Sequence, residues 1–395
     1  MKLYFFLLPG IMILFFSCKQ TFTPPAISSS RNYLVVEGVI NNSNDSTIIK
    51  LNYTVNIASN ATINPVLNAT VVVESDENIN YPLTELKNGK YFITNLSLDN
   101  SRKYRLSIKT NNNKQYYSDY VPVLNSPPID SLYYTVSNNN INIISEVHDV
   151  TNTVQYYRWE YNETWIIHAA FFSYFKSNGD TVLARDLVND NIYQCWSSDT
   201  SSTIVLNSTS KLKQTFLANN SITSFSLNSE KVANKYSILI KQYALSADAY
   251  IFWTNLKKNT EKLGGIFDPQ PSQINGNIHC DTDPSEPVIG YISVGSVASK
   301  RIFIANQQLP PTVPNVPYSD CIVETRLYAY LLPGTGHTIN QVNEYINYNK
   351  GAMFPQIPLV SITKPDGTIL GFTATTQFCA DCTLRGTNKK PNFWK

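Results

Sequence analysis

Residues 47–57 read TIIKLNYTVNI, and this stretch decides the fold class. Every second side chain from Ile49 to Ile57 is apolar, and the residues between them are polar. Such alternation places one face of a strand on a core and the other face in water. We therefore predict a half-buried β-strand at this point of the chain.

The flanking segments extend this pattern over residues 32–124. Short apolar segments alternate with turn-forming residues such as Asn111–Asn113, as expected for hairpins. The apolar segments are Leu34–Ile40, Pro65–Glu74, Gly89–Ile93, Tyr104–Ile108 and Tyr116–Val123. Their order resembles a prealbumin-like or carboxypeptidase-regulatory-like β-sandwich, which implies a structural or docking module. Pro127 and Pro128 then mark a boundary, since paired prolines suit neither a helix nor a central strand.

A larger β-rich domain is predicted over residues 129–395. Its most aromatic strand is VQYYRWEYNETW (154–165), and YSILIKQYAL (236–245) forms another. One main helix is predicted over about 246–263, with Ser246 as its N-cap and lysines near its end. The fold class is therefore mainly β, with a small sandwich followed by a larger β-domain carrying one helix.

The amino-acid composition and net charge argue against one class of function and support the fold class. The net charge is only +2, charged residues make up 15% of the 395 residues, and no basic stripe is present. These values argue against a nucleic-acid partner. The 25 Tyr and 18 Phe favour β-structure.

The N-terminus reads as an export signal. Lys2 precedes an apolar run that is too short to span a bilayer and that ends in LFFSC, with Cys18 last. We predict a lipoprotein signal peptide over 1–17, lipidation of Cys18, and a lipidated tether over 18–31. An ordinary secretory peptide and an uncleaved membrane anchor are the alternatives. Residues 19–22 contain no acidic residue, so the sequence does not decide whether the protein lies at the cell surface or on the periplasmic face of the outer membrane.

Five further cysteines predict disulfide chemistry in an exported protein, and their odd number leaves at least one unpaired or paired between chains. They are Cys195, Cys280, Cys321, Cys379 and Cys382. The last two form a CxxC motif, whose alternative interpretation is half of a zinc site completed by His279 and Cys280. We favour disulfides and predict no metal and no cofactor.

Aromatic side chains form the candidate ligand contacts. They are Tyr157, Trp159, Trp165 and Trp196, which could stack on a ligand but are more often core residues when they alternate along a strand. Glu160 and Glu163 are conceivable as a hydrolytic carboxylate pair, although a cross-strand ion pair involving Arg158, beside Trp159 and Trp165, is the favoured interpretation. We assign no catalytic residue.

Several stretches occur together in one order. They are LVVEG (34–38), IDSLYY (129–134), YRW (157–159), ETW (163–165), Cys195-Trp196, YSILIKQYALSADAYIFWTNLKKNTEKLGGIFDPQPSQINGNI (236–278), KRIFI (300–304) and FCADCTLRGTNKKPNFW (378–394). In this order they resemble the Bacteroidetes lipoprotein family catalogued as domain of unknown function 4249. The resemblance implies an outer-membrane lipoprotein encoded beside a TonB-dependent receptor, and it carries no catalytic residues.

The predicted function is therefore that of a non-enzymatic accessory or binding partner of a TonB-dependent receptor in nutrient uptake, for a small-molecule ligand that the sequence does not name. An envelope-assembly or adhesion protein and a secreted hydrolase are the alternatives.

Overall fold

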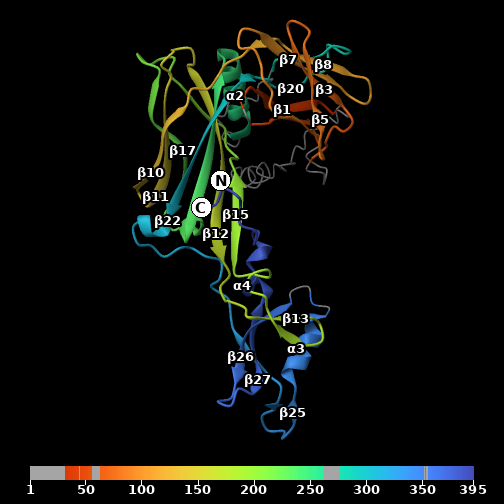
Figure 1. Ribbon diagram of the computed structural model, residues 1–395, viewed down its shortest axis with the longest axis vertical. Helices are drawn as coiled ribbons and strands as arrows, with labels where there is room; N and C mark the ends of the chain where they lie inside the picture. The colour runs from red at the N-terminus through yellow and green to blue at the C-terminus, as the bar shows by residue number, and fades with distance from the viewer. Residues whose placement is uncertain are drawn as a thin grey trace, which may run out of the picture.

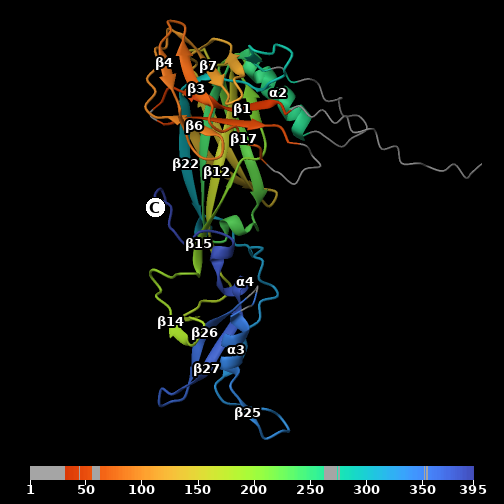
Figure 2. The same cartoon turned by 90° about the vertical axis from the view of Figure 1, so that its right-hand side faces the viewer.

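The computed structural model describes residues 32–395, except 44, 56–62, 262–273, 275, 351, 353 and 354. The predicted signal peptide, the tether and Cys18 lie outside the described residues. Figures 1 and 2 show three β-rich parts: a first sandwich, a second sandwich beside it, and a small distal body beyond the far end of the second sandwich. The mainly β prediction is confirmed. In the part of the chain that is described, no helix has the length and apolar character needed to cross a membrane.

The first sandwich packs two sheets face to face. One has the strand order β20-β1-β2-β6-β5 with β21 beside β1, and the other has the order β19-β8-β7-β3-β4 with β9 beside β7. The strands are β1 Leu34–Asn41, β2 Thr47–Tyr53, β3 Thr70–Ser75, β4 Asn80–Pro82, β5 Thr84–Glu85, β6 Lys90–Ile93, β7 Lys103–Lys109, β8 Gln115–Ser118, β9 Val121–Pro122, β19 Ile278–Cys280, β20 Ile289–Gly290 and β21 Val294–Gly295.

The alternation of apolar and polar residues in β2 gives the strand one buried and one exposed face, as predicted. Ile49 and Leu51 are fully buried between the sheets, whereas Ile48 is 44% exposed. Tyr91 of β6 is also fully buried, and its hydroxyl donates to the Val66 carbonyl at 2.9 Å. Apolar burial and satisfied polar groups together hold this sandwich.

Three strands of the first sandwich come from much later in the sequence. Val35 and Val36 of β1 pair in parallel with Ile289 and Gly290, and β19 pairs with β8. Ile292 is fully buried in the same core. The range 129–395 predicted as the second domain thus contains residues that complete the first sandwich. The chain passes between the two sandwiches more than once, which ties them together.

The second sandwich packs the sheet β10-β11-β17 against the sheet β15-β12-β18-β22, with β16 beside β12. Its core contains Tyr157, Trp159, Tyr236 and Ile238. The strands are β10 Ile129–Ser137, β11 Asn140–His148, β12 Tyr156–His168, β15 Gln194–Thr200, β16 Val205–Ser208, β17 Phe216–Ser226, β18 Lys235–Leu245 and β22 Val297–Ala305, and a 3-10 turn, η2, spans Glu230–Val232.

The predicted helix is α2, Ala247–Glu261. Ser246 caps it, because its hydroxyl accepts from the Ala249 backbone N–H at 3.2 Å. Ala249 and Phe252 are buried, and the helix contacts β12, β16 and β18. The predicted end at 262–263 lies outside the described residues.

The distal body contains the sheet β23-β27-β26, the hairpins β13-β14 and β24-β25, and a further helix, α3. Helix α3 is one that the sequence pattern does not predict: Asn340 caps it, and Val342, Tyr345 and Ile346 are buried at helical spacing. The elements are β13 Phe175–Ser177, β14 Val182–Ala184, β23 Glu324–Leu327, β24 Tyr330–Leu331, β25 Thr338–Ile339, α3 Gln341–Asn349, β26 Gln356–Thr363 and β27 Ile369–Thr376, followed by α4 Gln377–Ala380 and the 3-10 turn η4 Cys382–Leu384; the 3-10 turn η3, Asn306–Gln308, follows β22.

Candidate functional site

The aromatic strand β12 is largely a core element. Tyr157 and Trp159 are 0% and 1% exposed, and their rings stack with 5.7 Å between centroids. The Trp159 Nε1–H donates to Oε1 of Gln242 at 3.0 Å. The interpretation of Tyr157 and Trp159 as ligand contacts is wrong, because the facing sheet covers both rings.

The other two candidate aromatics lie elsewhere. Trp165 is half-buried, with the Lys231 ammonium 5.2 Å from its ring centroid. Trp196 is 9% exposed and lies edge-on to Trp394 at 6.4 Å between centroids. The structure therefore does not bring the four predicted aromatics together as one stacking platform.

Glu160 belongs to an ion-paired cluster with the side chains around Arg158. Arg158 Nη1 donates to Oε1 of Glu160 at 2.5 Å, and the Tyr243 hydroxyl donates to Oε2 at 2.7 Å. The Arg158 guanidinium also lies over the rings of Tyr243 and Trp253, at 4.4 and 4.1 Å from their centroids. Burial alone raises the pKa of Glu160, but the Arg158 charge and these hydrogen bonds outweigh burial and lower it. Glu160 is therefore held as an anion.

Glu163 has separate partners on the opposite face of β12. Its carboxylate is 2.5 Å from both the Lys231 Nζ and the Tyr236 hydroxyl, and the residue is 3% exposed. Burial, followed by the nearby Glu163 charge, raises the pKa of Tyr236 above its ordinary value. Glu160 and Glu163 do not face one another across a cleft, as a hydrolytic pair would. Both carboxylates are ion-paired as favoured, but the cross-strand geometry is wrong: Arg158 and Glu160 pair within β12, and Glu163 pairs with Lys231 of η2.

The cysteines form two long-range disulfides. Cys195 is bonded to Cys382, and Cys321 is bonded to Cys379. Among the cysteines that the structure describes, Cys280 is the unpaired thiol, and it is buried in the first sandwich. Each half of the CxxC motif therefore bonds to a different distant cysteine.

This pairing removes the ligands of the alternative zinc site. Both motif sulfurs are in disulfides, and His279 Nε2 is 3.1 Å from an Asp119 carboxylate oxygen. Over the described ranges, no group of three or more His, Cys, Asp and Glu side chains is arranged to hold a metal ion.

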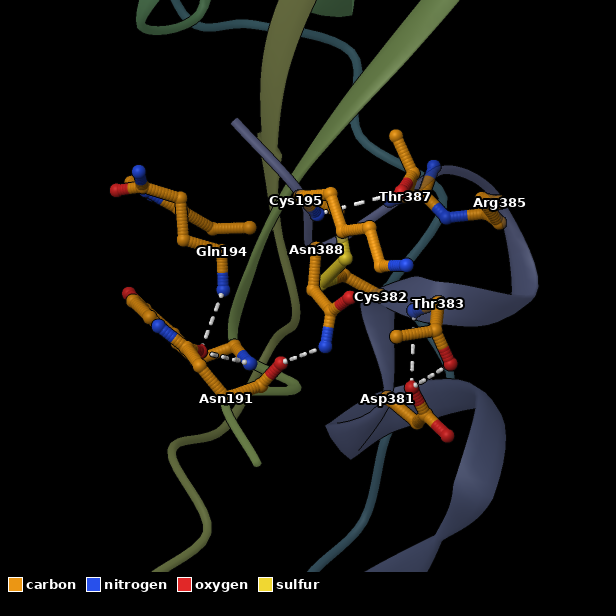
Figure 3. Close-up of a disulfide and its surroundings, with 12 residues drawn as sticks. Asn191, Gln194, Cys195, Asp381, Cys382, Thr383, Arg385, Thr387 and Asn388 are labelled. Atoms are coloured by element: carbon orange, nitrogen blue, oxygen red, sulfur yellow. Dashed lines mark hydrogen bonds between the residues drawn. A yellow bond between two sulfur atoms is a disulfide. The ribbon is translucent and has the colours of Figure 1, made fainter. Parts of the chain in front are cut away.

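The Cys195–Cys382 disulfide fastens the C-terminal tail to β15 of the second sandwich (Figure 3). Cys382 packs with Ile167 and Ala169 in a small buried cluster. The backbone of Thr387 exchanges hydrogen bonds with Trp196, and Asn388 Nδ2 donates to the Asn191 carbonyl at 2.9 Å. Between Cys382 and Thr387, Arg385 binds both carboxylate oxygens of Glu230 at 2.9 and 3.0 Å.

A hollow lined by both charged and apolar residues lies next to this junction, in the distal body. It encloses about 550 Å³, more than the hollow beside α3 (about 280 Å³) or the one on the first sandwich (about 330 Å³). Four segments line it: the region of the β13-β14 hairpin, the end of α3, the start of β26 and the C-terminal tail. Among its lining residues are Lys176, Arg185, Asp190, Lys350, Asp381 and Asn388. No sequence pattern pointed to this set, since its members come from separate segments; only the CxxC motif, which brackets Asp381, lay close to it.

A family model described as "Domain of unknown function (DUF4249)" matches residues 19–301. The chain belongs to the DUF4249 family. The match includes most of both sandwiches and ends within β22. The hollow of this DUF4249 protein therefore combines residues inside the matched range, such as Arg185, with residues beyond it, such as Lys350.

Comparison with curated proteins found no match for this DUF4249 protein. Solved structures with some similarity include a two-domain fibronectin type III segment of chicken tenascin (12% identity, 54% of this chain, 93% of that chain, TM-score 0.15). Another is a DUF3823 family protein from Bacteroides ovatus, with 11% identity, 54% of this chain and 91% of that chain covered, and a TM-score of 0.13. A third is a putative carbohydrate binding protein from Bacteroides uniformis, with 10% identity, 55% of this chain and 91% of that chain covered, and a TM-score of 0.14. We infer nothing about function from similarities with TM-scores this low.

Proposed function

We propose that this DUF4249 protein is a lipid-anchored, non-enzymatic binding protein of the outer membrane that partners a TonB-dependent receptor in nutrient uptake. The proposed anchor is Cys18 at the end of the LFFSC leader. Stable anchoring requires more than one acyl chain, which lipidation of such a cysteine supplies. In the same proposal, the first sandwich is prealbumin-like and serves as a docking module.

The observation that carries the proposal is the elongated arrangement of the three parts. The described chain begins at the first sandwich, and the distal body lies at the opposite end of the molecule (Figures 1 and 2). The part in which the described chain begins and the part furthest from it are thus different parts of the fold. This separation suits a protein that holds a partner away from its own attachment point.

The distal body also carries many exposed apolar side chains. Ile322, Leu331 and Tyr348 are 72%, 62% and 61% exposed, and further examples are Val323, Tyr328, Val360, Ile369 and Leu370. Exposed apolar side chains are the residues from which interaction sites are commonly built. We therefore place the receptor contact on the distal body.

The ionisable residues support a binding role over the hydrolase alternative. Glu160 and Glu163 lie on opposite faces of β12, and each is engaged by a cation and a tyrosine hydroxyl. Neither is placed beside a second free carboxylate, which glycoside hydrolysis requires.

The test is an affinity purification from gently solubilised outer membranes with a tag after Lys395, read by mass spectrometry. We expect one TonB-dependent receptor in near-stoichiometric amount. Leu331→Lys should reduce its recovery, because a charge would have to be buried at the contact. Val150→Lys is the matched control, since Val150 is 77% exposed in the second sandwich and should leave recovery unchanged.

Recovery of assembly factors without a receptor would contradict the proposal and favour the envelope-assembly alternative. Recovery of no specific partner would also contradict it. Equal loss of receptor in both variants would contradict the placement of the contact on the distal body.

A further inference from the structure

We infer that the C-terminal tail and the sheet face beneath it bind an anionic lipid membrane. This inference rests on the proposed location at the outer membrane. It deepens the proposed function, because it orients the protein relative to a receptor in the same membrane. The surface, named the tail face below, comprises Lys235, Arg301, Phe303, Lys389, Lys390, Phe393, Trp394 and Lys395.

The tail lies across the outer face of the sheet β15-β12-β18-β22, the face that points away from the core of the second sandwich. At one edge of this sheet, the backbone of Thr387 pairs with Trp196 of β15. Towards the other edge, the Trp394 ring lies edge-on to Phe303 of β22, with 5.6 Å between centroids. Trp394 is 6% exposed, so burial of its ring holds the tail against the sheet. In Figure 2 the chain end marked C lies at the side of the second sandwich.

Arg301 is a cation of the tail face without a carboxylate partner among the described residues. Its guanidinium lies 3.6 Å from the ring centroid of Phe393, and its Nη1 donates to Ser237 Oγ at 3.0 Å. Burial lowers the pKa of Arg301, whereas a neighbouring carboxylate would raise it. Arg385 shows the contrast: it also lies over a ring, but it is paired with Glu230 and its pKa is raised. Arg301 stays charged and keeps N–H groups for an external anion.

Four lysines add to this charge. Residues 386–395 read GTNKKPNFWK, with three lysines and no acid. Lys389, Lys390 and Lys395 are exposed, and none of them forms an ion pair within the described part of the chain. Lys235 of β18 is the fourth, and its Nζ donates to the Lys395 carbonyl oxygen at 2.8 Å.

The sheet face beneath the tail offers these cations no counter-charge. Glu160, further along β12, is paired with Arg158. Asp199 is the register partner of Glu163 and shares its face of the sheet, opposite to the tail. The register places two rows of side chains under the tail, and neither contains an acid: Thr200, Asn162, Leu239 and Arg301 in one row, and Ser198, Thr164, Ser237 and Phe303 in the other.

Acidic residues near the start of the tail are also engaged. Asp190 is paired with both Lys176 and Arg185. Asp381 is 8% exposed, and both of its oxygens accept hydrogen bonds from neighbouring side chains. The five cations of the tail face therefore form a local excess of positive charge, in a chain whose net charge is only +2.

A lipid membrane fits this surface better than a small anion does. The five cations are spread over a sheet face, and none of them lines the three hollows described above. Phe393, at 38% exposure, adds an aromatic ring among them, and rings beside lysines and arginines are favoured at the membrane interface. Long lysine side chains adapt to mobile headgroups, and the anionic surface attracts each of them.

The direction of the strands gives the orientation. Strands β12 and β22 run along the long axis of the molecule (Figures 1 and 2). A membrane against the outer face of their sheet would therefore lie parallel to that axis. In this orientation the distal body can reach a receptor embedded in the same membrane.

The test is co-sedimentation of the mature Cys18→Ser protein, which lacks the acyl anchor, with lipid vesicles. The vesicles contain phosphatidylcholine alone or equal parts of phosphatidylcholine and phosphatidylglycerol. The variant is Lys389→Gln with Lys390→Gln, and the matched control is Lys211→Gln with Lys213→Gln. Both control lysines are exposed and follow β16, which pairs with the start of β12, whereas the tail joins β15, which pairs with its end.

We expect binding to the anionic vesicles and not to phosphatidylcholine alone, and we expect it to weaken as salt is added. Each lysine removed from the tail face should weaken binding about fivefold, and the double variant about 25-fold. The control variant should bind like wild type.

Three results would overturn the inference: no binding to anionic vesicles, equal binding to both kinds of vesicle, or a loss in the control variant as large as in the tail variant. If the tail variant loses the receptor in the affinity purification while wild type binds no vesicles, the tail face contacts an acidic protein, and the lipid inference is wrong. Receptor recovery without any vesicle binding thus overturns this inference alone. Vesicle binding without a receptor overturns the receptor partnership alone.

Discussion

Removing the Cys195–Cys382 disulfide should strongly destabilise the attachment of the C-terminal tail. The perturbation is the double substitution Cys195→Ala and Cys382→Ala. The bond closes a loop with a sequence separation of 187 residues, whereas Cys321–Cys379 closes one with a separation of 58. A cross-link stabilises chiefly by restricting the unfolded chain, and more so for a longer loop.

The magnitude follows from those separations. Loop-closure entropy gives about 5 kcal/mol for the longer loop and about 4 kcal/mol for the shorter one. Both values are upper estimates, because unfolded chains keep residual structure. The predicted difference between the two double variants is therefore about 1 kcal/mol, with the longer loop costing more.

The assay is equilibrium unfolding in urea, followed by tryptophan fluorescence. Trp196 and Trp394 lie beside the tail junction and report on its release. Cys280→Ala is the matched control, since it removes a buried sulfur that is in no disulfide. The reasoning is refuted if the Cys195/Cys382 variant loses no more free energy of unfolding than this control. It is also refuted if the Cys321/Cys379 variant loses clearly more than the Cys195/Cys382 variant.

Two further predictions concern buried carboxylates. Glu163→Gln should lower the free energy of unfolding by about 2 kcal/mol, because it leaves Lys231 without its buried counter-charge; Glu37→Gln, whose ion pair is half exposed, should cost less than about 1 kcal/mol. Urea unfolding compares the two variants, and equal losses would contradict the prediction. Burial alone raises the pKa of Asp149, but hydrogen bonds from Thr151, Thr153 and Val154 outweigh it and lower that pKa. The Asp149 carboxylate therefore stabilises the fold above the unfolded-state pKa of about 4, and this contribution is lost as the pH falls through the lower folded-state value. Asp149→Asn should be less stable than wild type at pH 7 and should lose less stability between pH 4 and 2; parallel pH profiles of the urea midpoint would contradict this.

Local patterns were enough to predict strands such as β1, β2, β12 and β18 and the main helix. The alternation at Ile49 and Leu51 and the capping at Ser246 depend on neighbours in the sequence, so both could be read without a tertiary structure. Helix α3 was not predicted, because its segment, QVNEYINYN, is polar and has only three buried side chains. Its helical state depends on packing against the distal sheet.

The candidate aromatics show a different limit. A Tyr or Trp on an alternating strand has the same sequence pattern whether its ring faces a ligand or a second sheet. Burial of Trp159 beside Gln242 became visible only once the facing sheet was in place. The same holds for Glu160 and Glu163: the two-residue period placed them on opposite faces, but their partners Tyr243 and Lys231 come from other elements.

The sequence by itself determined the mainly β class, the position of α2 and the expectation that, of five cysteines, at least one stays unpaired or pairs between chains. These properties follow from composition, from periodicity and from counting, which need no contact between distant residues. Only the tertiary structure decided that Cys280 is the unpaired thiol, that residues 278–295 complete the first sandwich, and that Lys176 and Lys350 line one hollow. Each of these depends on which distant segments meet in the folded chain, and a local pattern in the sequence does not contain that information.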